Sequence, residues 1–112
     1  MSEFMFLYRG GERSGSPEEM QKVTQRWISW IQDLGEKGYL KSPGQPLELG
    51  GKVAGPQGVV TDGPYAESKD LVCGFTLIEA SDLAQASELT AGCPIFDGGG
   101  IVEVRPVMKM SM

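Results

Sequence analysis

The sequence predicts an α+β fold of the ferredoxin-like type, with two helices on one face of an antiparallel sheet. Three observations support this prediction. The chain has 112 residues, enough for one core, and we treat residues 1–112 as a single domain. Its segments follow the order strand, long helix, one or two strands, strand, short helix, strand. Two strand-like segments are apolar on both faces, which is typical of central strands.

The first strand is expected over residues 4–8, where FMFLY is apolar and aromatic throughout. A long helix should begin at Pro17, because Ser16 can cap its N-terminus and Glu19 completes a capping box. Gly38 is expected to end this helix in the left-handed conformation.

One face of the long helix is expected to pack on the core. At 100° per residue its apolar side chains fall within an arc of roughly 100°, and they are Val23, Trp27, Trp30, Ile31 and Leu34. We interpret both tryptophans as core anchors in preference to ligand-stacking groups. Ile28 lies outside this stripe and stays unassigned.

The second half of the chain is more irregular. Residues 41–58 are dense in Gly and Pro, with strand-like pieces only at residues 47–49 and near Val53, so an edge strand or a loop is expected. A short strand at residues 59–61 should lead into a DGP turn, and residues 71–78 should form a central strand. Ser81 should open a short helix that ends near Gly92.

The last strand is expected over residues 101–108. Its alternation places Val102, Val104 and Met108 on one side of the strand. Glu103 and Arg105 share the other side and should project together.

Charge and hydropathy exclude several classes of partner. The net charge is −5, and the basic residues are scattered from Arg9 to Lys109 without forming a patch, so no nucleic-acid partner is expected. No run of about 18 apolar residues and no basic leader is present, so we expect no membrane partner and a cytoplasmic location.

The sequence contains no histidine, the commonest general base and metal ligand. Any acid–base chemistry must therefore come from Asp, Glu, Tyr, Lys or Cys. The two cysteines, Cys73 and Cys93, do not stand at metal-ligand spacing, and we interpret them as reduced and buried. No metal and no cofactor are expected.

Two helices on one face leave the other face of the central strands uncovered. Apolar residues stand at both parities, as in Met5 and Leu7 against Phe4 and Phe6. A second copy of the chain is the simplest cover for this face, which predicts a homodimer with sheet packed against sheet.

The segment VVTDGPYAESKDLVCGFTLIE, with the later TAGCP and VEVRPV and the opening FMFLY, resembles the DGPF-domain branch of the YCII-related family. The resemblance covers nearly the whole chain, and Tyr65 stands where the branch usually has Phe. It implies a dimeric α+β barrel. Relatives that share this barrel include muconolactone isomerases, monooxygenases and a dehydrochlorinase. A His–Asp pair is proposed for some family members, but this chain has no histidine and cannot use one.

The stretch TDGPYAESKD has two interpretations. As a turn, Asp62, Gly63 and Pro64 shape the backbone, and Glu67 and Lys69 form a solvated pair. As a site, Asp62 is the candidate catalytic base at the barrel mouth.

The site interpretation has further candidate residues, all of them ligand-binding: Tyr65, Glu67, Lys69, Glu103 and Arg105. Tyr65 would form a wall, while Lys69 or Arg105 would receive an anionic group. Glu103 and Arg105 also fit an ordinary cross-strand ion pair.

Two functions therefore stay open. The first is binding of a small polar or aromatic molecule, with cofactor-free isomerase or lyase chemistry as its catalytic form. The second is a non-catalytic interaction module. The family's association with extracytoplasmic-function sigma factors by genomic neighbourhood implies such a factor as its partner.

Overall fold

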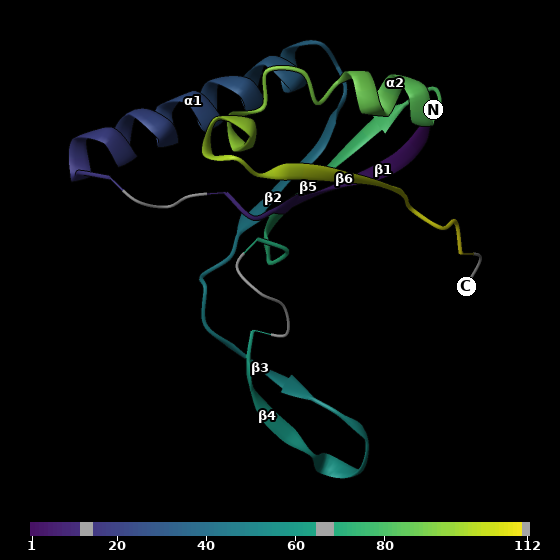
Figure 1. Cartoon of the computed structure of the whole chain (residues 1–112). Helices are drawn as coiled ribbons and strands as arrows, with labels where there is room; N and C mark the ends of the chain where they lie inside the picture. Colours follow the sequence, from purple (N-terminus) through teal and green to yellow (C-terminus); the bar gives the residue numbers. More distant parts are fainter. Residues whose placement is uncertain (12–14, 65–68, 111–112) are drawn as a thin grey trace.

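Four antiparallel strands form the main sheet of the computed structural model, in the spatial order β2-β5-β1-β6 (Figure 1). The structure describes residues 1–11, 15–64 and 69–110. The strands of this sheet are β1 (Ser2–Arg9), β2 (Leu40–Pro46), β5 (Val72–Ala80) and β6 (Ile101–Pro106). The two strands predicted to be central, β1 and β5, are the inner pair, so this prediction is confirmed.

Both α-helices lie on the same side of the main sheet (Figure 1). They are α1 (Pro17–Glu36) and α2 (Leu83–Glu88), and two short 3-10 helices, η1 (Pro56–Gly58) and η2 (Pro94–Gly98), complete the order. The predicted ferredoxin-like α+β fold is therefore confirmed. Its dimeric form stays a prediction.

The predicted ends of α1 are confirmed. The backbone N–H of Glu19 donates to Ser16 Oγ at 3.1 Å, which satisfies one of the free donors of the first turn. Gly38 follows the C-cap with φ +85°. The predicted start of α2 was one residue early, because Asp82 and not Ser81 is its N-cap and accepts from the backbone N–H of Gln85 at 2.8 Å, and the helix ends at Glu88, before the predicted end near Gly92.

The core lies between α1 and the face of the sheet that carries Phe4, Phe6 and Tyr8. The ring of Phe6 stacks on Trp30 with centroids 6.2 Å apart, and the rings of Tyr8 and Trp27 form a T-shaped pair with centroids 4.8 Å apart. Such aromatic pairs contribute about 0.5–1.5 kcal/mol beyond burial alone. Both tryptophans pack against the core, as predicted.

Strand β2 is an edge strand, one of the two alternatives expected for residues 41–58, whereas residues 47–49, predicted to be strand-like, lie outside any strand. Pro is tolerated in β2 because the strand is at the edge of the sheet. Gly44 has φ +69°, and a Cβ at this position would stand 1.8 Å from the carbonyl oxygen of Phe75. The register of β2 on β5 shifts on both sides of Ser42. Only glycine allows this close approach of the two strands.

A separate hairpin, β3 (Gly51–Ala54) paired with β4 (Val60–Gly63), stands away from the main sheet on the side opposite the helices (Figure 1). Asp62 and Gly63 lie within β4 and pair with Lys52 and Gly51. The expected turn after a strand at residues 59–61 was therefore wrong for Asp62 and Gly63, because β4 continues through Gly63.

The face of the main sheet away from the helices is partly apolar. Met5 lies opposite Leu77, and Leu7 lies opposite Phe75, so these four half-buried side chains share one face. Strand β6 adds Glu103 and Arg105 to this face and ends at Pro106, so Met108 lies beyond the strand predicted to include it. Within the described residues, no helix is long and apolar enough to span a bilayer.

Candidate functional site

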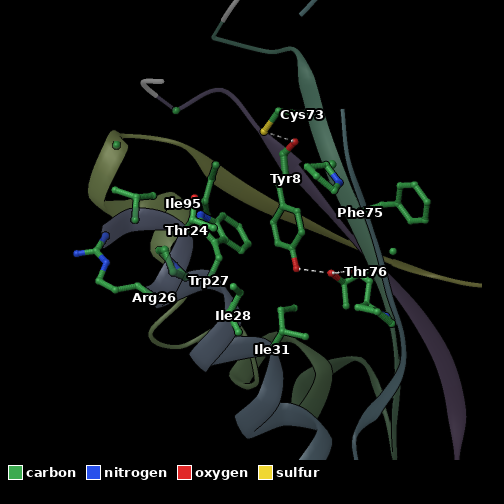
Figure 2. A pocket seen from close by; sticks show the side chains of 18 of the residues that line it. Tyr8, Thr24, Arg26, Trp27, Ile28, Ile31, Cys73, Phe75, Thr76 and Ile95 are labelled. Atoms are coloured by element: carbon green, nitrogen blue, oxygen red, sulfur yellow. Dashed lines mark hydrogen bonds between the residues drawn. The ribbon is translucent and has the colours of Figure 1, made fainter. Parts of the chain in front are cut away.

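A cavity of about 720 Å³ lies between residues 20–32 of α1 and the face of the sheet that the helices cover (Figure 2). Its volume falls within the range of roughly 300–1,000 Å³ that is usual for small-molecule sites. We call this cavity the helix–sheet pocket. Its walls come from β1, α1, β2, β5 and η2.

The floor of the pocket contains a chain of hydrogen bonds. The hydroxyl of Tyr8 donates to Thr76 Oγ1 at 2.7 Å, and Thr76 Oγ1 donates to the carbonyl oxygen of Pro43 at 3.0 Å. A carbonyl oxygen can only accept, so the Thr76 proton must point to Pro43 and the Tyr8 proton must point to Thr76. Burial raises the pKa of Tyr8 well above its ordinary value, so its phenol is neutral at physiological pH.

The α1 side of the pocket is mainly apolar, with Trp27, Ile28 and Ile31 among its lining residues, although Thr24 and Gln32 also line it. Figure 2 shows the ring of Tyr8 between these helix residues and the sheet, whereas the ring of Phe75 points away from the pocket. Ile28 is 46% exposed and Val23 is 42% exposed. The prediction that Val23 packs on the core was therefore wrong, because the pocket occupies the space beside this part of the helix.

Charged side chains stand at the edge of the pocket. Arg26 on α1 and Asp97 on η2 form an ion pair of 2.5 Å, and both side chains are more than half exposed. An exposed pair of this kind contributes about 0–1 kcal/mol. It links the helix to η2 without burying a charge.

Cys93 is a free thiol and is buried, as predicted, whereas Cys73 is only half-buried. Burial raises the pKa of the Cys93 thiol to about 12, so it is neither ionised nor nucleophilic at neutral pH. The Cys73 thiol lines the pocket and donates to the carbonyl oxygen of Tyr8 at 3.3 Å. Within the described part of the chain, no group of three or more His, Cys, Asp or Glu side chains is placed so that it could hold a metal ion.

Asp62 lies on the β3–β4 hairpin with its side chain 95% exposed, where it pairs with Lys52 at 3.2 Å. Lys69 is also exposed. Neither is among the residues that line the helix–sheet pocket. Tyr65 and Glu67, the other two candidates from this stretch, lie outside the described residues.

Glu103 and Arg105 do project together, on the face of the main sheet away from the helices, with Arg105 Nη1 3.4 Å from Glu103 Oε2. Arg9 Nε lies closer, 2.7 Å from Glu103 Oε1. Its hydrogen bond holds the pKa of Glu103 below the ordinary range. The pair thus lies on the opposite face from the pocket, while Asp62 belongs to the separate two-stranded sheet.

The residues that form the pocket were not predicted as a site. Thr76 interrupts the apolar run of residues 71–78 and is almost fully buried, and Ile28 is an apolar residue outside the helix stripe. Both signals are visible in the sequence. Both residues line the helix–sheet pocket.

The structural class of this protein is an antiparallel sheet that two helices cover on one face, with a pocket between α1 and the sheet. The family model described as the YCII-related domain matches residues 3–111. The chain therefore belongs to the YCII-related domain family, and the family resemblance predicted above is confirmed.

Comparison with curated proteins finds no significant match. Among solved structures, the chain is similar to 5-chloro-2-hydroxyhydroquinone dehydrochlorinase (TftG) from Burkholderia phenoliruptrix AC1100, in complex with 2,5-dihydroxybenzoquinone. The two share 19% identity over 90% of each chain, with a TM-score of 0.42. A likeness of this degree indicates neither the ligand nor the reaction of the present chain.

Proposed function

We propose that this protein binds a small, mainly apolar molecule of about the size of one or two aromatic rings in the helix–sheet pocket. The observation that supports the proposal is a cavity of about 720 Å³ that meets Tyr8, Trp27 and Ile28 on one side of a structured core. A cavity of this size beside aromatic and branched apolar side chains is typical of a ligand site.

The exposed apolar residues of α1 support the same conclusion. Ile28 and Val23 belong to a helix whose neighbouring residues Trp27, Trp30 and Leu34 are packed, yet they face open space. A ligand that covers them gains about 25 cal/mol for each Å² of apolar surface removed from water. This gain favours an apolar ligand over a highly charged one.

A catalytic form of this function, such as cofactor-free isomerisation or elimination, stays a prediction. It needs a base whose proton affinity suits neutral pH and which reaches the bound molecule. Tyr8 is neutral and Cys93 is protonated in this range. Asp62, the candidate base from the sequence, is exposed on the β3–β4 hairpin and does not line the pocket. Binding is therefore the function that the pocket supports best.

The test fills the pocket from the helix side. Ile28→Trp places a larger side chain into the cavity, and Leu83→Trp is the matched control, because Leu83 is 48% exposed on α2 and does not line the pocket. Binding of 2-naphthol, a neutral bicyclic aromatic probe, is measured by calorimetry. Wild type and Leu83→Trp should bind equally, and Ile28→Trp should bind at least about tenfold more weakly, a change of about 1.4 kcal/mol. Equal binding by all three proteins would overturn the proposal.

We also propose that a second copy of the chain covers the other face of the sheet. The half-buried patch of Met5, Leu7, Phe75 and Leu77 supports this proposal, since apolar faces of central strands are normally packed. The alternative function, a regulatory module that binds a sigma factor, stays a prediction. The mass of the particle in solution distinguishes the homodimer from the sigma-factor module, because a homodimer that persists at micromolar concentration leaves this face unavailable to another protein.

A further inference from the structure

The hydrogen bonds on the floor of the helix–sheet pocket have a fixed direction. The carbonyl of Pro43 has no proton, so Thr76 must donate to it at 3.0 Å. Thr76 has only one proton, and its oxygen must therefore accept the proton of Tyr8 at 2.7 Å. The Tyr8 hydroxyl thus has its proton already engaged.

A phenol oxygen that donates its proton can still accept a hydrogen bond. Tyr8 lines the pocket, and Figure 2 shows its hydroxyl end directed toward Thr76, Ile28 and Ile31. The isoleucines carry no polar group, so neither can supply a donor to that oxygen. The Tyr8 oxygen is consequently a polar acceptor in an apolar part of the pocket.

We propose that the ligand of this pocket is an uncharged aromatic molecule that carries an O–H or N–H group and donates it to the Tyr8 oxygen. This inference rests on the proposed function and adds the chemical class of the ligand. A carboxylate or a phenolate has no proton to donate, and its charge would be desolvated by the isoleucines. An ether or a hydrocarbon of the same shape leaves the acceptor unmatched.

The residues around Tyr8 keep the direction of these hydrogen bonds unchanged near neutral pH. Burial keeps the Tyr8 phenol protonated, so the oxygen does not become a charged acceptor for cations. The charged groups at the pocket edge, Arg26 and Asp97, are paired with each other. Which ligands the pocket binds therefore depends on whether they carry a hydrogen-bond donor.

Two probes of nearly the same shape test the class of ligand. Both 2-naphthol and 2-methoxynaphthalene carry an oxygen that accepts, but only 2-naphthol carries a proton that donates. The methoxy compound is the more apolar of the two, so apolar burial alone would favour it. Wild type should bind 2-naphthol about three- to tenfold more tightly, the factor that one neutral hydrogen bond supplies.

Two variants test the direction of the hydrogen bonds from Tyr8 to Thr76 and from Thr76 to Pro43. Tyr8→Phe removes the acceptor and should abolish the preference for 2-naphthol, so that apolar burial alone decides between the probes. Thr76→Val removes the group that holds the Tyr8 proton, so the phenol is free to donate and the preference should move toward 2-methoxynaphthalene. Tyr39→Phe is the control, since its hydroxyl accepts from Gln85 outside the pocket, and it should keep the wild-type preference. If Thr76→Val does not fold, Tyr8→Phe alone decides the result.

The outcomes separate this inference from the proposed function. Equal binding of both probes to wild type, or a preference for 2-naphthol that survives in Tyr8→Phe, would overturn the assignment of a donor-bearing ligand while leaving the pocket as a binding site. Failure of both probes to bind wild type would overturn the proposed function itself. A preference for 2-naphthol that is lost in Tyr8→Phe would support both.

Discussion

Gly44 determines whether β2 can approach β5 closely enough to form the edge of the pocket. In Gly44→Ala the new Cβ would stand 1.8 Å from the carbonyl oxygen of Phe75, and this atom belongs to the backbone of a central strand. The strands must separate, which breaks the hydrogen bond from Thr76 to Pro43. A left-handed alanine costs about 1–2 kcal/mol, and the buried groups left without partners cost about 1–3 kcal/mol. We therefore expect a loss of about 2–5 kcal/mol in the free energy of unfolding.

Gly38→Ala is the matched control for this prediction. Gly38 has φ +85°, similar to the +69° of Gly44, but an added Cβ would meet nothing within 4 Å. It should lose only the backbone cost of about 1–2 kcal/mol. Urea denaturation followed by circular dichroism measures both variants. Equal losses in the two proteins would refute the conclusion that the close contact of β2 with β5 requires glycine.

Three further predictions concern ionisation, the predicted site and assembly. Because the pKa of Tyr8 is raised, the fold favours its neutral form, so the free energy of unfolding should fall as pH rises above about 10. The tyrosinate absorbance of wild type and Tyr8→Phe should coincide at about pH 10 and differ only above it. Asp62→Asn should change stability by less than about 0.5 kcal/mol and leave 2-naphthol binding intact, because its pair with Lys52 is exposed; loss of binding would return Asp62 to the site. Light scattering after size exclusion should give twice the chain mass at micromolar concentration, and a folded monomer would contradict the dimer.

Strands β1 and β5 and helix α1 could be predicted because their signals are local. An apolar run marks a buried strand, and Ser16 with Pro17 marks a helix start whatever the rest of the chain does. The error at α2 is also local, since Ser81 and Asp82 are both good caps and the sequence does not rank them. Strand β2 was obscured because its Pro and Gly residues suit an edge strand with a bulge as well as a loop.

The pocket could not be predicted because it depends on how α1 lies across the sheet. The helical stripe correctly placed Leu34 in the core but assigned Val23 to the same environment, although a cavity separates the start of the helix from the strands. The motif around Asp62 was a candidate site because several of its residues are charged or polar. Its location on an exposed hairpin follows from strand pairing, which the motif does not encode.

The most direct measurement of the central claim is a titration of the isoleucine methyl groups with 2-naphthol, followed by NMR. Ile28, Ile31 and Ile95 line the helix–sheet pocket and Ile101 lies on the opposite face of the sheet, so their δ1 methyl groups report on the two faces separately. Ring-current shifts fall off steeply with distance, so the site of binding is read from which methyl groups move. The account predicts saturable shifts at Ile28, Ile31 and Ile95 with none at Ile101. Shifts at Ile101 without any at Ile28 would contradict it.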